Sequence, residues 1–313
     1  MPDSRTATWK LVLGYTAFAL VAFALFFAWT FPSEAARDRV SLEAAARGYD
    51  VRMSRLAPGL FGLTAADVEV RPKRPDNAPD DAPEPEPLKI DSIALRPSLF
   101  PLGVHVRASA FNGVIDGAAG GLGTVRVKLD LDGLDLSAGN LKAFSGLDMS
   151  GTLNGSVDLI IPKSGGTAGT AARPEVPAQP DLGQASGTLT LTGKDIVLNG
   201  GAIESIPALS GGFPKIALGE LNAKLTFDKG AGKVEALEVK GGDVTLEGTG
   251  TIRLARRWDY ADTNVDLKFK VSDEARARLG MVAAGLSMLK ADPKDPSYRV
   301  VKMTGYLGRP NFR

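Results

Sequence analysis

The chain has 313 residues, 44% of them hydrophobic, which suits a folded protein of one large or two ordinary domains. Its 37 Lys and Arg residues balance 36 Asp and Glu residues, so no overall field attracts nucleic acid and we expect no nucleic-acid partner. Cysteine is absent and His105 is the single histidine, which excludes disulfides, thiol catalysis and multi-histidine metal sites.

The first element in the chain is an uncharged apolar segment, residues 11–31. As a helix it would be about 31 Å long, which matches the roughly 30 Å hydrocarbon core of a bilayer. We therefore expect a tail at 1–10 and a transmembrane helix at 11–31. The alternative is a cleaved signal peptide, whose apolar region is typically shorter. The candidate membrane-anchor residues are Leu11, Phe18, Phe23, Phe27 and Trp29.

The next segment, residues 32–50, predicts a short juxtamembrane helix with Ser33 as its N-cap and Gly48 at its end. The remainder, 51–313, is interrupted by two stretches rich in proline and polar residues, 72–87 and 162–184. Such compositions bury little apolar surface, so both predict disordered, solvated loops rather than docking motifs.

Most of 51–313 alternates between apolar and polar residues with period two, as in "TVRVKLDLDG" and "NVDLKFKV". Strands that are apolar on one face and wet on the other are typical of antiparallel sheets. One helix is expected at 272–290, opening with Ser272. The fold class is therefore mainly β, with an N-terminal transmembrane helix, an antiparallel sheet and a few short helices.

Glycines in "LEVKGGDVTLEGTGTIRL" mark two different features. Gly241 and Gly242 lie between two alternating runs and predict a hairpin turn. Gly248 and Gly250 instead fall on the apolar face in mid-strand, where a sheet curls or another group approaches closely. A strand follows them, whereas a phosphate loop would need a helix. The candidate apolar groove or core comprises Leu189, Leu191, Leu225, Phe227, Val244, Leu246, Gly248, Gly250, Ile252, Leu267 and Phe269.

The remaining polar motifs fit structural roles. Asp130, Asp132 and Asp135 do not have the residue spacing of a calcium-binding loop. We interpret them as the solvent-exposed face of a strand and its turn. His105 has neither a second histidine nor a nucleophile elbow as partner. The glycine-rich run at 117–124 precedes a strand, which is the wrong context for dinucleotide binding. We expect no catalytic residues, no metal site, no cofactor and no small-molecule substrate.

An ordered series of segments resembles the type II secretion system protein N (GspN) family. It includes "LKIDSIALRPSLFPL", "ASGTLTLTGKDIVLNGG" and the closing pattern of Gly305, Leu307, Pro310 and Phe312. The related AsmA-like envelope proteins share the style of these strands. The resemblance implies a single-pass protein of the Gram-negative inner membrane whose periplasmic β-rich domain is accessory to protein secretion. The AsmA-like kinship implies a curled sheet with an apolar concave side.

Two functions follow as hypotheses. In the first, the β-domain binds other subunits of the secretion machine. In the second, the apolar face binds or conducts membrane lipid, because an apolar strip above a few hundred Å² does not stay in water uncovered. A closed core would favour the first hypothesis and an open trough the second.

Overall fold

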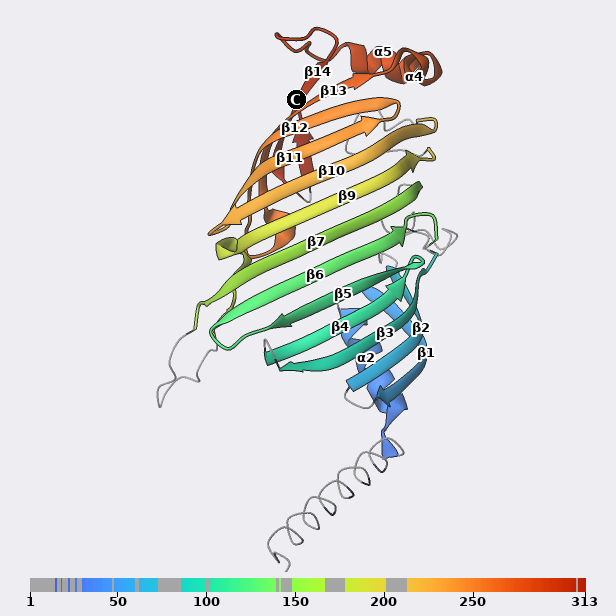
Figure 1. The fold of residues 1–313 in the computed structure, drawn as a ribbon, viewed down its shortest axis with the longest axis vertical. Helices are drawn as coiled ribbons and strands as arrows, with labels where there is room; N and C mark the ends of the chain where they lie inside the picture. The colour runs from blue at the N-terminus through green and yellow to red at the C-terminus, as the bar shows by residue number, and fades with distance from the viewer. Residues whose placement is uncertain are drawn as a thin grey trace, which may run out of the picture.

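The computed structural model describes residues 15, 18, 22, 26, 30–46, 48–59, 62–72, 86–99, 102–138, 141, 148–166, 178–200, 213–307 and 309–313. Its dominant feature is one large antiparallel sheet (Figure 1). The strands are β1 (Tyr49–Gly59), β2 (Gly62–Pro72), β3 (Leu88–Leu99), β4 (Leu102–Ala110), β5 (Gly113–Gly120), β6 (Thr124–Asp135), β7 (Met149–Ser164), β8 (Gln179–Pro180), β9 (Ser186–Leu198), β10 (Ile216–Asp228), β11 (Ala231–Gly241), β12 (Val244–Arg253), β13 (Asp262–Val271), β14 (Arg299–Tyr306) and β15 (Arg309–Phe312).

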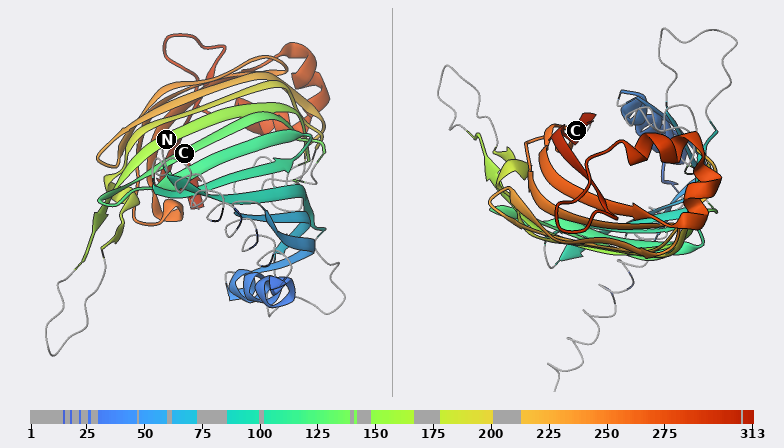
Figure 2. Two further views of the ribbon diagram at one scale, coloured as in Figure 1. Left: turned by 60° about the horizontal axis from the view of Figure 1, so that its bottom comes forward. Right: turned by 90° about the horizontal axis from the view of Figure 1, so that it is seen from above.

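The strands follow one another across the sheet almost in chain order. Fourteen of them form a single antiparallel path from β1 to β15, and only the short β8 lies off it, paired with β7. The two ends of the path are separate edges, so the sheet is open rather than closed. This confirms the expected mainly β, antiparallel class. Figure 2 shows that the sheet bends into an open curl.

The ends of the strands form two opposite rims of the sheet. We call the rim at Met149, Leu198 and Val271 the cavity rim, because the cavities described below lie there. The other, at Gly120, Arg253 and Tyr306, we call the aromatic rim. The hairpin predicted at Gly241 and Gly242 is confirmed and lies at the cavity rim, joining β11 to β12 with Gly241 at φ +82°.

The predicted juxtamembrane helix is present as α2 (Ser33–Ala46). The Ala36 amide donates to the Pro32 carbonyl, so Pro32 precedes the first turn and Ser33 is a helical residue rather than the N-cap. The helix packs on β1, where Ser41 Oγ donates to the Val51 carbonyl at 3.0 Å. Gly48 follows at φ +86°, as a glycine helix end requires.

The membrane-anchor prediction falls largely outside the described residues, because Leu11, Phe23, Phe27 and Trp29 are not among them. Phe18 is described, is helical and is 72% exposed. Within the part of the chain that the structure describes, no helix has both the length and the apolar character needed to cross a bilayer.

The two predicted loops have narrower bounds in the structure. β2 runs to Pro72 and β3 begins at Leu88, with 73–85 outside the described residues. In the second stretch, β7 continues to Ser164, and residues 178–184 form β8 and the short helix η1 (Leu182–Gln184). The predicted limits of this loop, 162–184, are therefore too wide. Proline and glycine near its ends did not prevent β7 from continuing as a strand, because both residues are tolerated where a strand pairs at the edge of a sheet.

The helix expected at 272–290 is divided into α4 (Asp273–Leu279) and α5 (Met281–Ser287). Ser272 caps α4 as predicted, since its hydroxyl accepts a hydrogen bond from the Ala275 amide. Gly280 separates the two helices at φ +52° and ψ −117°, a conformation outside the helical region that glycine adopts without a side-chain clash. A single continuous helix is therefore wrong.

Candidate functional site: an open apolar trough

A continuous apolar row crosses the whole sheet, with one residue from each of the fourteen strands of the path. Each member is the register partner of the next. The row is Pro58, Leu63, Leu95, Val106, Gly117, Leu129, Val157, Leu189, Leu225, Val234, Gly250, Val265, Met303 and Phe312. With neighbouring strands about 4.8 Å apart, the row is about 60 Å long along the curve.

A second row lies on the same face, two residues along each strand, or three on β11, where the register shifts. Its members run from Leu56 through Ala65, Ile93, Ala108, Ile115, Leu131, Gly155, Leu191 and Ala223 to Leu237. It resumes at Gly248 and continues through Leu267 to Val301. Because side chains alternate between faces, two adjacent rows without a polar residue make the middle of this face apolar from one end of the sheet to the other.

All eleven residues of the predicted groove or core lie on this face. Leu189, Leu225 and Gly250 belong to the first row, and Leu191, Gly248 and Leu267 to the second. The others flank the two rows towards one rim or the other. Val244, Leu246 and Phe269 lie towards the cavity rim, and Phe227 and Ile252 towards the aromatic rim.

Burial separates a closed core from an open surface. Of those eleven residues, only Phe227, at 6% exposed, and Gly248 are buried, whereas the other nine are partly exposed. A row covered by a second layer would be buried throughout. We call this partly exposed apolar face the trough.

The glycines in β12 allow the sheet to fold tightly at the trough. A Cβ on Gly248 would lie 2.5 Å from Leu237 Cδ2, so the absent side chain leaves room for that leucine. Gly250 has φ +152°, and a Cβ there would lie 2.3 Å from the carbonyl oxygen of Asn264 on the neighbouring strand. The prediction of close approach at these glycines is confirmed at both positions.

Among the residues that the structure describes, helices cover the trough face only near its ends. Ala36 of α2 packs against a cluster of Leu56, Ala65 and Val68 on the first strands. At the other end, Ala275, Leu279 and Ala283 of α4 and α5 pack with Val271 and Phe213. Figure 2 shows these helices on the concave side of the curl, so the trough is its inner surface.

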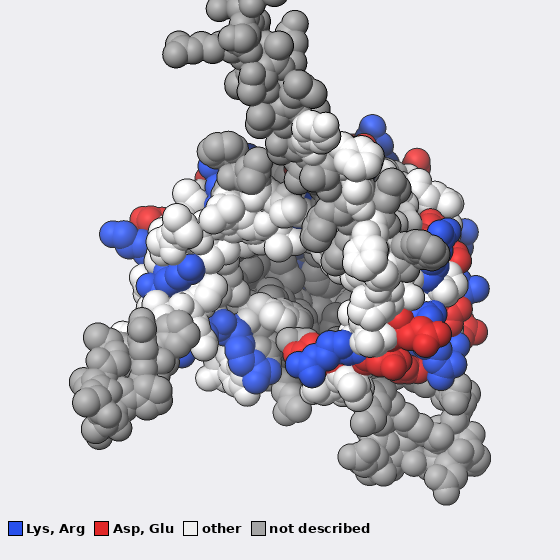
Figure 3. All heavy atoms as spheres, turned by 90° about the horizontal axis from the view of Figure 1, so that it is seen from below, with Lys and Arg blue, Asp and Glu red and all other residues white. Residues whose placement is uncertain are grey.

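In the space-filling view along the long axis of the curl, the described residues that border the central hollow are mostly uncharged, and Lys, Arg, Asp and Glu gather on the outside and rim (Figure 3). Two cavities lie at the cavity rim. One, of about 690 Å³, lies between Arg71 and Lys89 and the segment at Leu136. The other, of about 430 Å³, lies where Phe269 and Val271 of the trough meet Arg276 and Arg299.

The convex face is polar and its charges are paired across strands. Lys224 Nζ lies 2.8 Å from Glu235 Oε2, and Lys268 Nζ lies 2.9 Å from Glu247 Oε2. The hydrogen bond to Glu247 raises the pKa of Lys268 above its ordinary value. Such exposed pairs contribute little stability individually. Their charges favour exposure of this face to solvent, and so favour placing the opposite, apolar side of each strand on the concave face.

The candidate chemical residues of the sequence also lie on this polar face or its turns. His105 Nε2 is 2.9 Å from Asp116 Oδ1, a contact between neighbouring strands β4 and β5. Asp135 accepts hydrogen bonds from the Ser137 hydroxyl and amide, which lower the pKa of its carboxyl group. Among the described residues, no three His, Asp or Glu side chains come together as metal ligands would.

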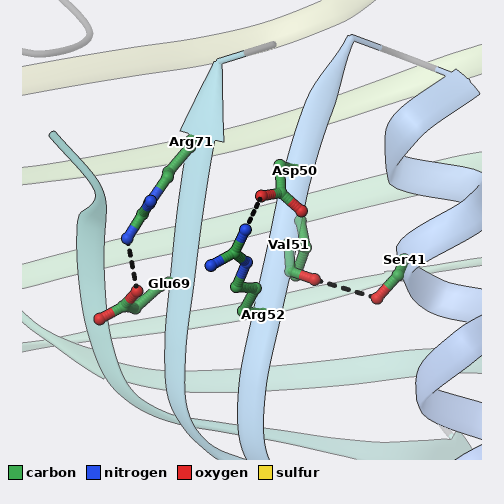
Figure 4. Close-up of polar contacts among 6 residues, drawn as sticks. All are labelled: Ser41, Asp50, Val51, Arg52, Glu69 and Arg71. Carbon is green, nitrogen blue, oxygen red and sulfur yellow. Dashed lines mark hydrogen bonds and ion pairs between the residues drawn. The ribbon is translucent and has the colours of Figure 1, made fainter. Parts of the chain in front are cut away.

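The first strands carry a charged ladder that sequence reasoning did not identify. Figure 4 shows Asp50 and Arg52 on β1 beside Glu69 and Arg71 on β2. Arg52 is paired with Asp50 at 3.2 Å, and Arg71 with Glu69 at 3.3 Å. Arg52 is also the register partner of Glu69. The alternation of charges in "YDVRM" and "VEVRP" was the available signal, and it places these charges opposite the apolar row.

Comparison with known proteins gives no relative: no family model, no curated protein and no solved structure matches the chain.

Proposed function

We propose that this protein holds the acyl chains of membrane lipids in the trough, as a lipid-binding or lipid-conducting element of a cell envelope. The observation that supports the proposal is the uninterrupted apolar row, one residue from each of fourteen strands, most of which remains partly exposed. An apolar surface of this extent is unfavourable in water unless a ligand covers it.

The shape favours a chain-like ligand over a compact one. The row follows the curl for about 60 Å, about twice the thickness of a bilayer's hydrocarbon core. A compact small molecule would need an enclosed pocket with a few converging polar groups. An acyl chain needs only a continuous apolar surface, because its transfer from water is favourable by about 0.8 kcal/mol for each buried CH₂ group.

The cavity of about 430 Å³ offers a place for a lipid headgroup. It adjoins Phe269 and Val271 of the trough, and its polar lining includes Lys270, Arg276 and Arg299. Arg276 donates to Asp273, which neutralises part of this positive charge. The remaining cations favour an anionic headgroup whose acyl chains lie on the apolar face of the trough.

A photo-reactive residue in the trough tests the proposal. Full-length protein carrying p-benzoylphenylalanine in place of Leu225 should cross-link to lipid, and the adduct mass identifies it. The matched control places the same residue at Thr226, the next position on β10 and on the opposite face. Lipid adducts at both positions, or at neither, would count against a lipid-binding trough.

The partner-binding hypothesis predicts a different adduct. The order of segments that resembles the GspN family supports a role in type II secretion, in the Gram-negative inner membrane with the β-domain in the periplasm. If that role uses the trough, the residue at position 225 should cross-link to an apolar segment of another envelope protein instead of lipid. The same experiment therefore separates the two functions.

A further inference from the structure

An exposed aromatic patch lies at the aromatic rim, apart from the trough. It consists of Trp258 and Tyr260 in the turn between β12 and β13, and of Tyr306 and Leu307 at the end of β14. Their exposed fractions are 66%, 52%, 55% and 39%, respectively. Single exposed apolar residues are ordinary on protein surfaces, but three large exposed aromatic residues in two adjoining segments are not.

The structure holds the patch together. The rings of Tyr260 and Tyr306 meet edge to face, with centroids 5.7 Å apart. The Leu307 amide donates to the Ala261 carbonyl at 2.8 Å, which ties the end of β14 to the turn. The patch is therefore a preformed surface built from two segments of the chain.

The patch does not belong to the trough. Tyr306 is the register partner of Asp262, in the same alternation as Thr304 and Lys302 on the convex face. The trough residues Met303 and Gly305 lie on the other face of the same strand. An aromatic side chain in an otherwise polar row is not needed to complete the core.

Arginines surround these rings. Arg253, Arg256 and Arg257 lie in or beside the turn and are exposed. The same stretch of sequence contains two acidic residues, Asp259 and Asp262. The Arg257 guanidinium lies over the Tyr260 ring, 5.1 Å from its centroid. Within the described part of the chain, neither Arg253 nor Arg256 forms an ion pair. Three arginines against two aspartates give this segment a formal charge of +1 (3 − 2), which suits an anionic partner.

We propose that this patch docks on the surface of an anionic lipid bilayer. Trp and Tyr prefer the membrane interface because one end of each ring system is apolar and the other is polar. Nearby arginines are attracted to anionic headgroups. Soluble protein partners would also use aromatic and arginine residues, but the flanking positive charge favours a uniformly negative surface. This inference does not depend on what the trough binds.

A site-specific probe tests the docking in the full-length chain. Because the chain has no cysteine, Leu307→Cys can be labelled at one position with a fluorophore that brominated lipid quenches. The control is Met288→Cys, a 90% exposed apolar residue just after α5 at the cavity rim. Each labelled protein is reconstituted with an excess of phosphatidylcholine vesicles, with or without phosphatidylglycerol, that contain brominated lipid.

Quenching should occur at position 307, should need phosphatidylglycerol and should exceed quenching at position 288. Arg256→Gln with Arg257→Gln should weaken the docking equilibrium about 25-fold, at about a factor of five for each arginine. Trp258→Ala should weaken it with the net charge unchanged. Unaltered thermal unfolding shows that these variants fold. The proposal would be overturned by equal quenching at both positions or by quenching that does not depend on phosphatidylglycerol. It would also be overturned by no quenching at position 307, and a protein would then be the better candidate for the partner of the patch.

Discussion

At the scale of single residues, the two glycines of β12 have different reasons to lack a side chain. At Gly248 the obstacle is Leu237 Cδ2, the end of a flexible side chain, whereas at Gly250 it is the backbone oxygen of Asn264. Gly250 also has φ +152°, which an L-residue rarely adopts. The sequence pattern shows both as glycines on the apolar face, but only backbone geometry separates their roles.

Gly250→Ala should therefore destabilise the fold more than Gly248→Ala. We expect a loss of roughly 1–3 kcal/mol at Gly250 from the strained backbone, with further loss from the clash at Asn264. At Gly248 the facing leucine can change its rotamer, which reduces the effect. Chemical denaturation of the full-length variants, followed by circular dichroism, measures the difference. Equal losses would mean that side-chain packing, and not backbone conformation, governs both positions.

The pairing of Arg126 with Asp158 makes one charged site on the convex face sensitive to pH. Arg126 Nε and Nη2 donate to the two carboxylate oxygens at 3.0 and 2.7 Å, and these hydrogen bonds lower the pKa of Asp158. Because the folded pKa lies below the unfolded one, the pair contributes stability above the unfolded pKa. That contribution is lost as pH falls through the folded pKa.

Arg126→Gln should raise the pKa of Asp158 towards its ordinary value, which a titration of the carboxyl carbon chemical shift by NMR can follow. Lys128→Gln is the control, since Lys128 Nζ is 3.8 Å away and makes a weaker electrostatic contribution. The effect on global stability should be small because both side chains are substantially exposed to solvent. A larger shift from Lys128 than from Arg126 would be incompatible with this geometry.

At the scale of elements, alternation predicted the strands well because each strand has one wet face. The runs containing Leu129, Leu225 and Leu267 are β6, β10 and β13, and their apolar residues share one face. Pattern could not predict the break between α4 and α5. The spacing of Leu279 and Leu286 suits one helix, but Gly280 adopts φ +52° between them, and residues of both short helices pack in the same cluster.

Other elements show why composition alone is a coarse guide. Proline and glycine near 162–184 predicted a loop, yet pairing with β6 extends β7 to Pro162 and pairing with β8 extends it to Ser164. The aromatic patch was also missed. Trp258 and Tyr306 are 48 positions apart in the sequence, and only the antiparallel register of β13 and β14 brings their turns to one rim.

At the scale of the whole molecule, the fold separates two kinds of surface. The trough is apolar and lies inside the curl, whereas the aromatic patch carries arginines and lies at a rim. The sequence shows that one face is apolar, but not whether that face is covered. A covering layer would consist of other elements packed across it, and in the described part of the chain helices reach only the two ends of the trough.

These two surfaces should respond differently to salt. Screening shortens the reach of exposed charges from about 30 Å at 0.01 M salt to about 3 Å at 1 M. Docking of the patch on anionic vesicles should therefore weaken strongly over this range, read from quenching at position 307. Lipid held in the trough should remain, because apolar burial does not depend on screened charge. Cross-linking at position 225 measures this second quantity in the same samples. Loss of both signals together would show that patch and trough hold the same lipid through its headgroup, whereas persistence of both would mean that docking is apolar and that the arginines have no part in it.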